Sequence, residues 1–181
     1  MNKGFVNAFQ KLITKQNKDV LPEANPKFNI TSVIIFAIFF TIAIALDQWV
    51  KLIILNGFRW ESEFIDITLT FNKGVAFSMF AALGDALKYL QVLLVLGAII
   101  YVFYTRLILK YAFEIGLLLG AGVSNISDRF FREGVVDYVF WHYGFEFAIF
   151  NLADVFIDCA IAAILFKYIM EIRAERSKLS L

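Results

Sequence analysis

The 181-residue chain has very few of the residues that disulfides and metal sites require. It contains one cysteine, Cys159, and one histidine, His142. A single cysteine excludes an internal disulfide and any multi-cysteine metal site, and a single histidine weakens the case for zinc. The net charge is only +1, so no strong field favours nucleic acid or an acidic partner. We therefore predict no metal, no cofactor and no nucleic-acid partner.

Apolar residues, in contrast, are abundant. Hydrophobic residues make up 60% of the chain, with 21 phenylalanines, whereas ordinary soluble domains contain about 45–50% apolar residues. This excess and several long uncharged runs indicate an integral membrane protein. At this length we expect a single domain.

Four segments have the character of membrane-spanning helices. The first is an uncharged run of 19 residues, close to the roughly 20 that cross a bilayer. The predicted spans are residues 28–46, 89–104, 111–126 and 147–170. In the third, Gly116 and Gly120 form a GxxxG pair that lets helices approach closely, although such pairs also arise by chance.

Residues 58–71 have a period of two. Apolar residues from Ile65 to Phe71 alternate with Asp66, Thr68 and Thr70, which predicts a strand with one apolar face. A turn-like segment, 72–78, follows. We interpret residues 128–146 as a polar and aromatic excursion that forms a hairpin near Gly144. The predicted fold class is an all-α membrane protein with four transmembrane helices.

Basic segments flank the predicted membrane domain. Residues 1–27 form either an amphipathic helix on the membrane surface or a basic tail, residues 28–170 form the membrane domain, and residues 171–181 form a second basic tail. Of the 17 Lys and Arg residues, 11 lie in the terminal regions and the 105–110 connection. Positive charge favours the cytoplasm, so we expect both termini inside and the acid-rich segments outside.

Several acids lie near membrane depth, where carboxylates are costly and usually mark function. Two carboxylates brought together cannot easily both ionise, so the pair can serve as base and acid. Asp137 and Asp154 are candidates, although the sequence alone does not show that they meet. We interpret Asp128 as part of a structural cluster with Arg129 and Asn125 at the end of the third helix.

Five motifs occur in order along the chain. They are Asp47-Gln48 with Lys51, Asn72-x-Gly74-x-Ala76-Phe77-Ser78, Asn125-x-x-Asp128-Arg129, Val136-Asp137-Tyr138, and Phe150-Asn151-x-Ala153-Asp154-x-x-Ile157. Asp47 and Lys51 are four residues apart and can pair on one helix face. Together the motifs resemble the bacterial lipoprotein signal peptidases, or signal peptidase II, over roughly residues 30 to 170.

The resemblance implies an aspartyl endopeptidase of the bacterial inner membrane. Such enzymes cut diacylglyceryl-modified prolipoproteins just before the lipidated cysteine, at a site toward the extracytoplasmic face under a small β-cradle. It implies that Asp137 and Asp154 are the catalytic pair and that no cofactor is needed. The positions it marks as substrate-binding or supporting are Asp47, Lys51, Asn72, Gly74, Asn125, Asp128, Arg129, Asn151 and Ala153. The expected partners are prolipoprotein substrates and membrane lipid, and the oligomeric state stays open.

The chain also departs from the family pattern. Ser124 stands where a glycine is common, and Val75, Val155 and Ala160 replace other small residues. Asp158 is an extra acid to which we assign no role. The alternative function is a non-enzymatic membrane carrier or assembly factor in which buried acids relay protons, but a carrier has no reason to combine these motifs.

Overall fold

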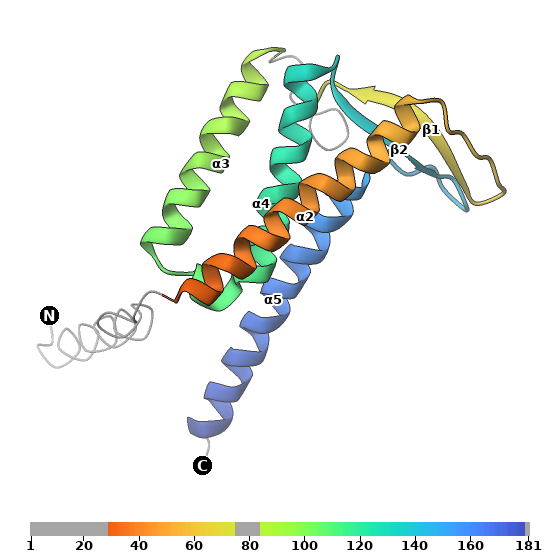
Figure 1. Ribbon diagram of the computed structural model, residues 1–181. Coiled ribbons are helices and arrows are strands. Elements are labelled where there is room, and N and C mark those ends of the chain that lie inside the picture. The colour runs from red at the N-terminus through yellow and green to blue at the C-terminus, as the bar shows by residue number, and fades with distance from the viewer. Residues whose placement is uncertain (1–28, 75–83, 180–181) are drawn as a thin grey trace, which may run out of the picture. The chain divides into compact units, whose positions relative to one another are not determined.

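The computed structural model describes residues 29–74 and 84–179 (Figure 1). Within these residues the chain forms four helices and a two-stranded antiparallel sheet. The elements are α2 (Ile30–Leu55), β1 (Ile65–Asn72), α3 (Ala86–Tyr104), α4 (Ile108–Phe131), β2 (Val135–Trp141) and α5 (Leu152–Leu179). The predicted mostly helical architecture is confirmed. The predicted amphipathic helix in residues 1–27 lies outside the described residues, as does the 75–78 part of the predicted turn.

Helices α2 and α3 are long and apolar enough to cross a membrane. Many of their large apolar side chains point outward, including Ile30 at 61% exposed, Leu93 at 66% and Ile100 at 69%. Exposure of this extent is unusual for a soluble protein but suits contact with lipid.

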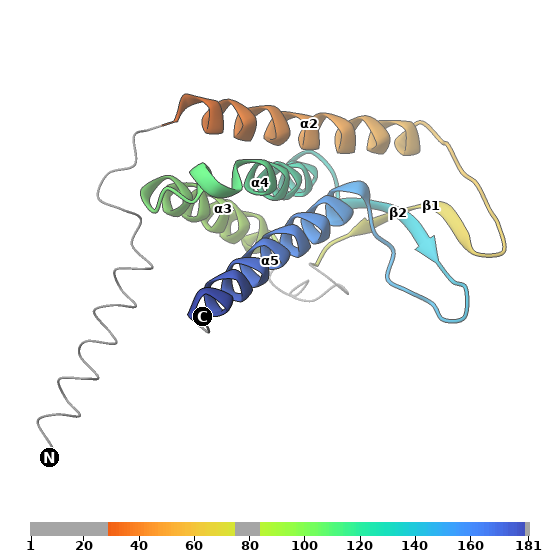
Figure 2. The ribbon, with the colours of Figure 1, turned by 90° about the horizontal axis from the view of Figure 1, so that it is seen from below.

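Helix α4 lies at the centre of the bundle, with α2, α3 and α5 packed around it (Figure 2). Its residues Ile108, Tyr111, Ile115 and Leu119 pack against apolar residues of α2 and α3. Leu117 meets Ala160 of α5. Three neighbouring helices therefore fix the position of α4.

Gly116 and Gly120 explain how α4 and α2 approach each other. A methyl group on Gly116 would lie 2.6 Å from the carbonyl oxygen of Phe36, and one on Gly120 would meet the backbone of Phe40 even more closely. Only glycine fits such contacts between helix backbones. The GxxxG pair, a weak signal in the sequence, is confirmed as a packing site.

The helices extend further than their uncharged runs. Helix α2 continues nine residues beyond the predicted end at Leu46, to Leu55, and α4 continues beyond residue 126 to Phe131. The predicted membrane spans ended where charged or polar residues begin, although Asp47 and Lys51 were already placed on one helix face. The helices continue because these polar side chains have partners on neighbouring helices and so remain inside helical segments. Helix α2 ends before Gly57, which has a φ of 100° that favours glycine.

The sheet lies at one end of the bundle (Figure 1). The strand predicted over 58–71 is shorter, with β1 beginning at Ile65, although Trp60 forms an isolated bridge to Ile67. The predicted apolar face is present, because Ile67, Leu69 and Phe71 pack around Ile54, Val136 and Tyr138. This packing attaches the sheet to the end of α2.

Strand β2 pairs with β1 rather than with a neighbouring segment of its own excursion. The chain nevertheless folds back within residues 128–146 and just beyond. Val139 forms an antiparallel bridge with Phe150, and Gly144 in the connection has a φ of 77°. Helix α5 begins at Leu152 rather than at the predicted residue 147. Asp154 therefore lies in the first turn of α5, nearer the start of the helix than a helix beginning at residue 147 would place it.

Candidate active site

The sheet register places Asn72 and Asp137 on the same face. Thr70 pairs with Asp137, and Asn72 is two residues from Thr70 along β1. Since side chains alternate along a strand, both point to the face of Thr70. The Asn72 amide nitrogen donates a hydrogen bond of 3.0 Å to an Asp137 carboxylate oxygen. The Gly74 N–H donates to the Asn72 amide oxygen at 2.9 Å, which fixes the direction of that amide.

The first turn of α5 positions Asp154 through a reciprocal cap. The Asp154 N–H donates to the Asn151 side-chain oxygen at 3.0 Å, and the Asn151 N–H donates to the Asp154 carboxylate at 3.0 Å. This is the capping-box arrangement, in which residues three apart satisfy each other's free N–H groups. Asp154 is thereby held in place by the start of its own helix.

Asn151 connects the two acids. Its amide nitrogen donates to Asp137 at 2.7 Å and to the Asn125 side-chain oxygen at 3.1 Å, while its backbone N–H binds Asp154. Asn125, from α4, completes the ring by donating to Asp154 at 3.0 Å. The two candidate acids, 17 residues apart in sequence, are thus held by two asparagines.

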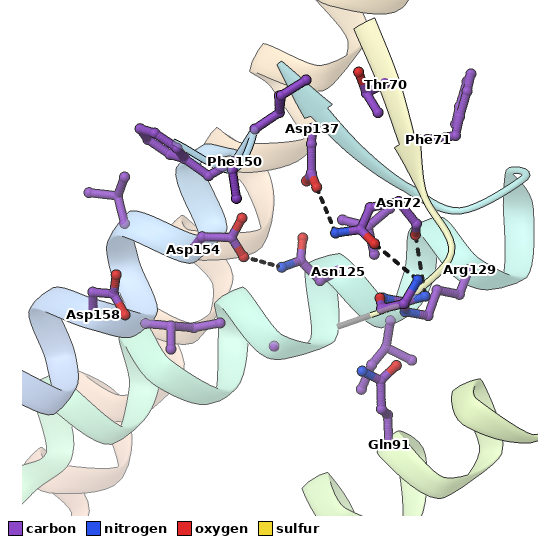
Figure 3. Close-up of a pocket in the computed structure, with 18 of the residues that line it drawn as sticks. Thr70, Phe71, Asn72, Gln91, Asn125, Arg129, Asp137, Phe150, Asp154 and Asp158 are labelled. Atoms are coloured by element: carbon purple, nitrogen blue, oxygen red, sulfur yellow. Dashed lines mark hydrogen bonds between the residues drawn. The ribbon is translucent and has the colours of Figure 1, made fainter. Parts of the chain in front are cut away.

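Both acids line a cavity of about 900 Å³ (Figure 3). Its wall is mostly apolar and includes Leu94 and Val95 from α3 and Phe150 before α5. Asp137 is only 3% exposed, and burial raises the pKa of its carboxyl to about 6. The hydrogen bond from Asn72 opposes this rise, and the charge of Asp154 adds to it. A carboxyl with such a pKa can take up or release a proton near neutral pH.

A buried cluster of charged side chains lies beside the acids. The Lys51 ammonium is completely buried and lies 2.6 Å from Asp47, 2.7 Å from Asp128 and 2.7 Å from the Asn125 side-chain oxygen. The predicted Asp47–Lys51 pair is confirmed. The sequence did not predict that this pair is buried. It also did not predict that Lys51 is linked to Asp154 through Asn125. We call Asp47, Lys51 and Asp128 the Lys51 cluster.

The interpretation of Asp128 requires a correction. Asp128 pairs with Lys51 and with Arg132, one helical turn further along α4, and not with Arg129. It also accepts a hydrogen bond of 3.1 Å from the Val136 N–H. The structural role and the link to Asn125, through Lys51, are present, but the choice of Arg129 as partner was wrong because neighbouring residues on a helix point in different directions, whereas residues four apart share a face.

Arg129 has different partners. Its guanidinium donates to the backbone carbonyl oxygens of Asn72 and Gly74. These are the residues that orient the amide on Asp137. Ala153 also has a defined place, because its N–H donates to Asp47 at 2.9 Å. All nine predicted supporting residues therefore belong to one connected hydrogen-bond network.

Sequence reasoning missed some members of this network. Ser124, noted only as a departure from the family pattern, donates to Asp47 at 2.6 Å. Gln48 donates to Asp128 and to the Ser124 hydroxyl, both at 2.9 Å. Gly134 allows close approach, since a methyl group there would lie 2.8 Å from the Asn72 carbonyl oxygen. Gly134 lies between α4 and the run Val135-Val136-Asp137, and this glycine is the sequence feature from which the close approach could have been predicted.

Two further residues can now be placed. Asp158 lines the same cavity as Asp154 and is exposed. His142 lies 3.2 Å from Asp66 on the sheet and is not part of the cavity wall. The prediction that no metal is needed stays a prediction.

Known proteins resemble this chain over most of its length. The family model described as signal peptidase (SPase) II matches residues 38–170. The lipoprotein signal peptidase of Helicobacter pylori (strain Shi470) is 52% identical over 137 residues, which cover 75% of this chain and 87% of the relative. That of Wolinella succinogenes is 55% identical over 129 residues, covering 71% and 88%. That of Campylobacter jejuni (strain RM1221) is 51% identical over 140 residues, covering 77% and 88%.

A solved structure shares the fold. It is described as a bacterial membrane enzyme structure at 2.3 Å resolution and superposes with a TM-score of 0.64 at 24% identity, covering 80% of this chain and 90% of the solved one. The fold, the family match and the relatives agree. The chain belongs to the signal peptidase II family.

Proposed function

We propose that this protein removes signal peptides from prolipoproteins, with Asp137 and Asp154 as its catalytic pair. Signal peptidase II enzymes are aspartyl peptidases, and the relatives at about 50% identity are named lipoprotein signal peptidases. The observation that carries the site is the shared asparagine: Asn151 hydrogen-bonds both carboxylates at the wall of one cavity.

The reaction needs one carboxylate and one carboxylic acid. The ionised member takes a proton from water, and the resulting nucleophile attacks the carbonyl carbon of the scissile peptide. The protonated member donates a hydrogen bond to the carbonyl oxygen, where negative charge develops. Burial of Asp137, together with the charge of Asp154, makes it unfavourable for both to ionise, so the pair can carry a single shared proton.

The surrounding residues have two proposed roles. Asn72, Asn125 and Asn151 hold the carboxylate oxygens in place with neutral N–H donors. The Lys51 cluster and Arg129 act further out, by fixing these asparagines and the backbone around Gly74. Such support keeps catalytic groups in productive geometry.

The substrate's lipid would hold the substrate in the membrane beside the enzyme. A diacylglyceryl group on the cysteine is retained in lipid by burial of its acyl chains, at about 0.8 kcal/mol per CH₂ group. The peptide then needs only to reach the two acids. We propose that cleavage occurs just before this cysteine and that the acyl chains stay in the bilayer beside the bundle.

We propose that α4 and α5 cross the membrane together with α2 and α3. The start of α2, the α3–α4 connection and the end of α5 all lie away from the sheet (Figure 1). The α3–α4 connection contains Arg106, and the end of α5 contains Arg173 and Arg176. Positive charge favours the cytoplasm, so the sheet would lie over the extracytoplasmic face as a cradle, and both termini would be cytoplasmic in a bacterial inner membrane. Residues 1–27 and 171–181 would then be cytoplasmic segments around a membrane domain at 28–170.

The test uses the purified full-length protein in detergent with a diacylglyceryl-modified prolipoprotein. The wild type should release the signal peptide by a single cut before the modified cysteine, and the unmodified substrate should be a poor one. Asp137→Asn should abolish release. Asp66→Asn is the matched control, because Asp66 lies on β1 and pairs with His142 outside the cavity; it should cleave normally.

Two results would contradict the proposal separately. No cleavage by the wild type would remove the proposed function. Full activity of Asp137→Asn would leave the function standing and remove the assignment of the acid pair. The alternative, a carrier that relays protons through buried acids, predicts no cut peptide and is not favoured by the relatives.

A further inference from the structure

Tyr138 follows Asp137 on β2, and its side chain points to the opposite face of the sheet. Side chains alternate along a strand, so Asp137 reaches the cavity while Tyr138 packs with Ile54 and Val136 on the apolar face. Tyr138 is 5% exposed. A buried tyrosine usually places its hydroxyl group on a hydrogen-bond partner, so the partner indicates what the residue does.

The Tyr138 hydroxyl group reaches the start of α5. It accepts a hydrogen bond of 3.0 Å from the N–H of Leu152, the first residue of that helix. The first N–H groups of a helix have no partner inside the helix, so they need partners from elsewhere. The next two N–H groups of α5 donate to a carboxylate of α2 and to the side chain of the cap residue. Strand β2 thus holds the end of α5 through the Tyr138 side chain.

This hydrogen bond joins the two elements that carry the acids. Asp137 is one residue before Tyr138, and Asp154 is two residues after Leu152. The Tyr138 ring is rigid and packed, and the Tyr138 N–H also donates to the Phe150 carbonyl oxygen at 3.0 Å. The tyrosine is therefore a spacer of fixed length between β2 and α5, whereas the asparagine contacts orient the carboxylate oxygens.

We propose that Tyr138 is a positioning residue that sets the spacing of Asp137 and Asp154, through the hydrogen bond from the Leu152 N–H to its hydroxyl group. Tyr138 does not line the cavity, so it acts through the two acids and not on the substrate. Catalysis by a pair of groups depends on their placement, because a shift of about 1 Å can cost on the order of a hundredfold in rate. The inference rests on the proposed function and on the catalytic pair.

The Tyr138 hydroxyl group does not titrate in the pH range of a cleavage assay. Burial raises its pKa above the ordinary value of 10.0, the hydrogen bond from Leu152 opposes this rise, and the charges of Asp47, Asp154 and Asp137 add to it. The tyrosine is therefore neutral wherever cleavage is measured. A change in the pH dependence of cleavage after removal of this hydroxyl group reports on the acids.

The test uses the purified full-length protein in detergent and a diacylglyceryl-modified prolipoprotein peptide. The values of kcat and KM, the pH profile of kcat/KM and the melting temperature are measured for the wild type, Tyr138→Phe and Tyr111→Phe. Tyr138→Phe removes one oxygen atom and keeps the ring. Tyr111→Phe is the matched control, because Tyr111 is also buried, at 6% exposed, but packs in the core between α2, α3 and α4.

The expected result is a slower reaction with a shifted pH profile. In Tyr138→Phe we expect kcat to fall about tenfold and KM to change less than about twofold, because the spacing of the acids affects the reaction step. The charge of Asp154 helps to raise the pKa of Asp137, so a wider spacing should lower the upper apparent pKa of the pair. The pH profile of Tyr138→Phe should therefore decline at a lower pH than that of the wild type, and Tyr111→Phe should keep the wild-type kcat and profile.

Two outcomes would overturn the inference. Unchanged kcat in Tyr138→Phe would show that the hydroxyl group does not position the acids. A fall in kcat with an unmoved pH profile would assign the loss to a weakened fold and not to the spacing. In both cases the wild type still cleaves, so the proposed function survives. Absence of cleavage by the wild type would instead contradict the function on which the inference rests.

Discussion

The Lys51 cluster and the Asp137–Asp154 pair are adjacent, but their carboxylates have different kinds of partner. In the cluster, a buried ammonium lies within 2.7 Å of two carboxylates, and Arg132 adds a second cation beside Asp128, so every carboxylate there has a cationic partner. Around the pair, the groups that hydrogen-bond the carboxylates are asparagine amides and a backbone N–H. Among the described residues no Lys or Arg nitrogen lies within ion-pair distance of either acid.

Under the proposed function, this difference separates the residues that hold the fold from the residues that react. A cationic partner stabilises the ionised form of an acid and removes its ability to exchange a proton. Neutral donors hold the oxygens in place with a weaker bias toward the ionised form. The comparison predicts that changes in the cluster affect folding, whereas changes in the pair affect the reaction.

The largest effect should follow replacement of Asp154. Asp154→Asn keeps the shape of the side chain and an oxygen for the Asn151 N–H, but removes the proton-exchanging group. We expect the cleavage rate to fall by about a thousandfold or more, since the pair acts as a unit, with the melting temperature in detergent little changed. Asp158→Asn is the control, because the reaction assigns this acid no role, and it should retain activity. Comparable loss in both variants would contradict the distinction between the two acids.

Replacing Lys51 should lower the stability of the fold and not only the activity. Lys51→Met leaves Asp47 and Asp128 buried without their shared cation, and breaking a buried ion pair in this way costs about 3–5 kcal/mol. Denaturant titration in detergent measures the loss. Lys110→Met removes a half-exposed pair with Glu171 and should cost less than about 1 kcal/mol. Equal free energies of unfolding in the two variants would mean that the buried Lys51 cluster contributes no more to stability than the half-exposed Lys110–Glu171 pair.

The pH dependence of stability gives the next largest effect. The pKa of Asp137 is about 6 in the folded protein, above its ordinary value of 3.8, so the fold favours the protonated form. This contribution is fully present below pH 4 and is lost as the pH rises through 6. At about 1.4 kcal/mol per pH unit, the loss reaches about 3 kcal/mol.

Thermal unfolding of the wild type and Asp137→Asn between pH 4 and pH 7 measures this term. The stability of the wild type relative to the variant should fall over that range and then level off. A difference that is constant with pH would mean that Asp137 titrates at its ordinary pKa.

The smallest effect concerns backbone contact near the pair. Gly134→Ala would place a methyl group 2.8 Å from the Asn72 carbonyl oxygen, so β1 must shift and carry the Asn72 amide away from Asp137. We expect kcat to fall by about tenfold, or roughly 1.4 kcal/mol in the barrier. Gly97→Ala is the matched control, because nothing lies within 4 Å of its methyl position. Unchanged kcat in Gly134→Ala would indicate that the sheet absorbs the methyl group without moving Asn72.

The sequence predicted the helical plan because hydrophobic runs and helical periodicity are local properties. It placed the helix boundaries less well, since Asp47 and Lys51 resemble the end of a span until their partners on α4 are known. The start of the last helix was also predicted too early. The apolar run from Phe147 is typical of a helix, but Phe150 forms a β-bridge with Val139 instead.

Sequence motifs identified the members of the candidate site, but not the contacts among them. The choice of Arg132 over Arg129 as the partner of Asp128 depends on which way each side chain leaves the helix. The position of Asn151 between the two acids depends on the strand register and the helix start together. The contacts of Ser124 and of Gln48, a member of the first motif, were not predicted because polar residues within an apolar helix give no sign of their partner.

The Asn151 contacts have a consequence for the length of the chain between the two acids. Asp137 is fixed by β1 and by Asn151, and Asp154 is fixed by the cap that Asn151 forms. The bridge between Val139 and Phe150 closes off the residues between them. Residues 143–146 thus form a tether whose length does not set the spacing of the carboxylates. An epitope or a fluorescent label inserted there should leave the peptidase intact, which makes this tip a practical handle for following the enzyme in a membrane.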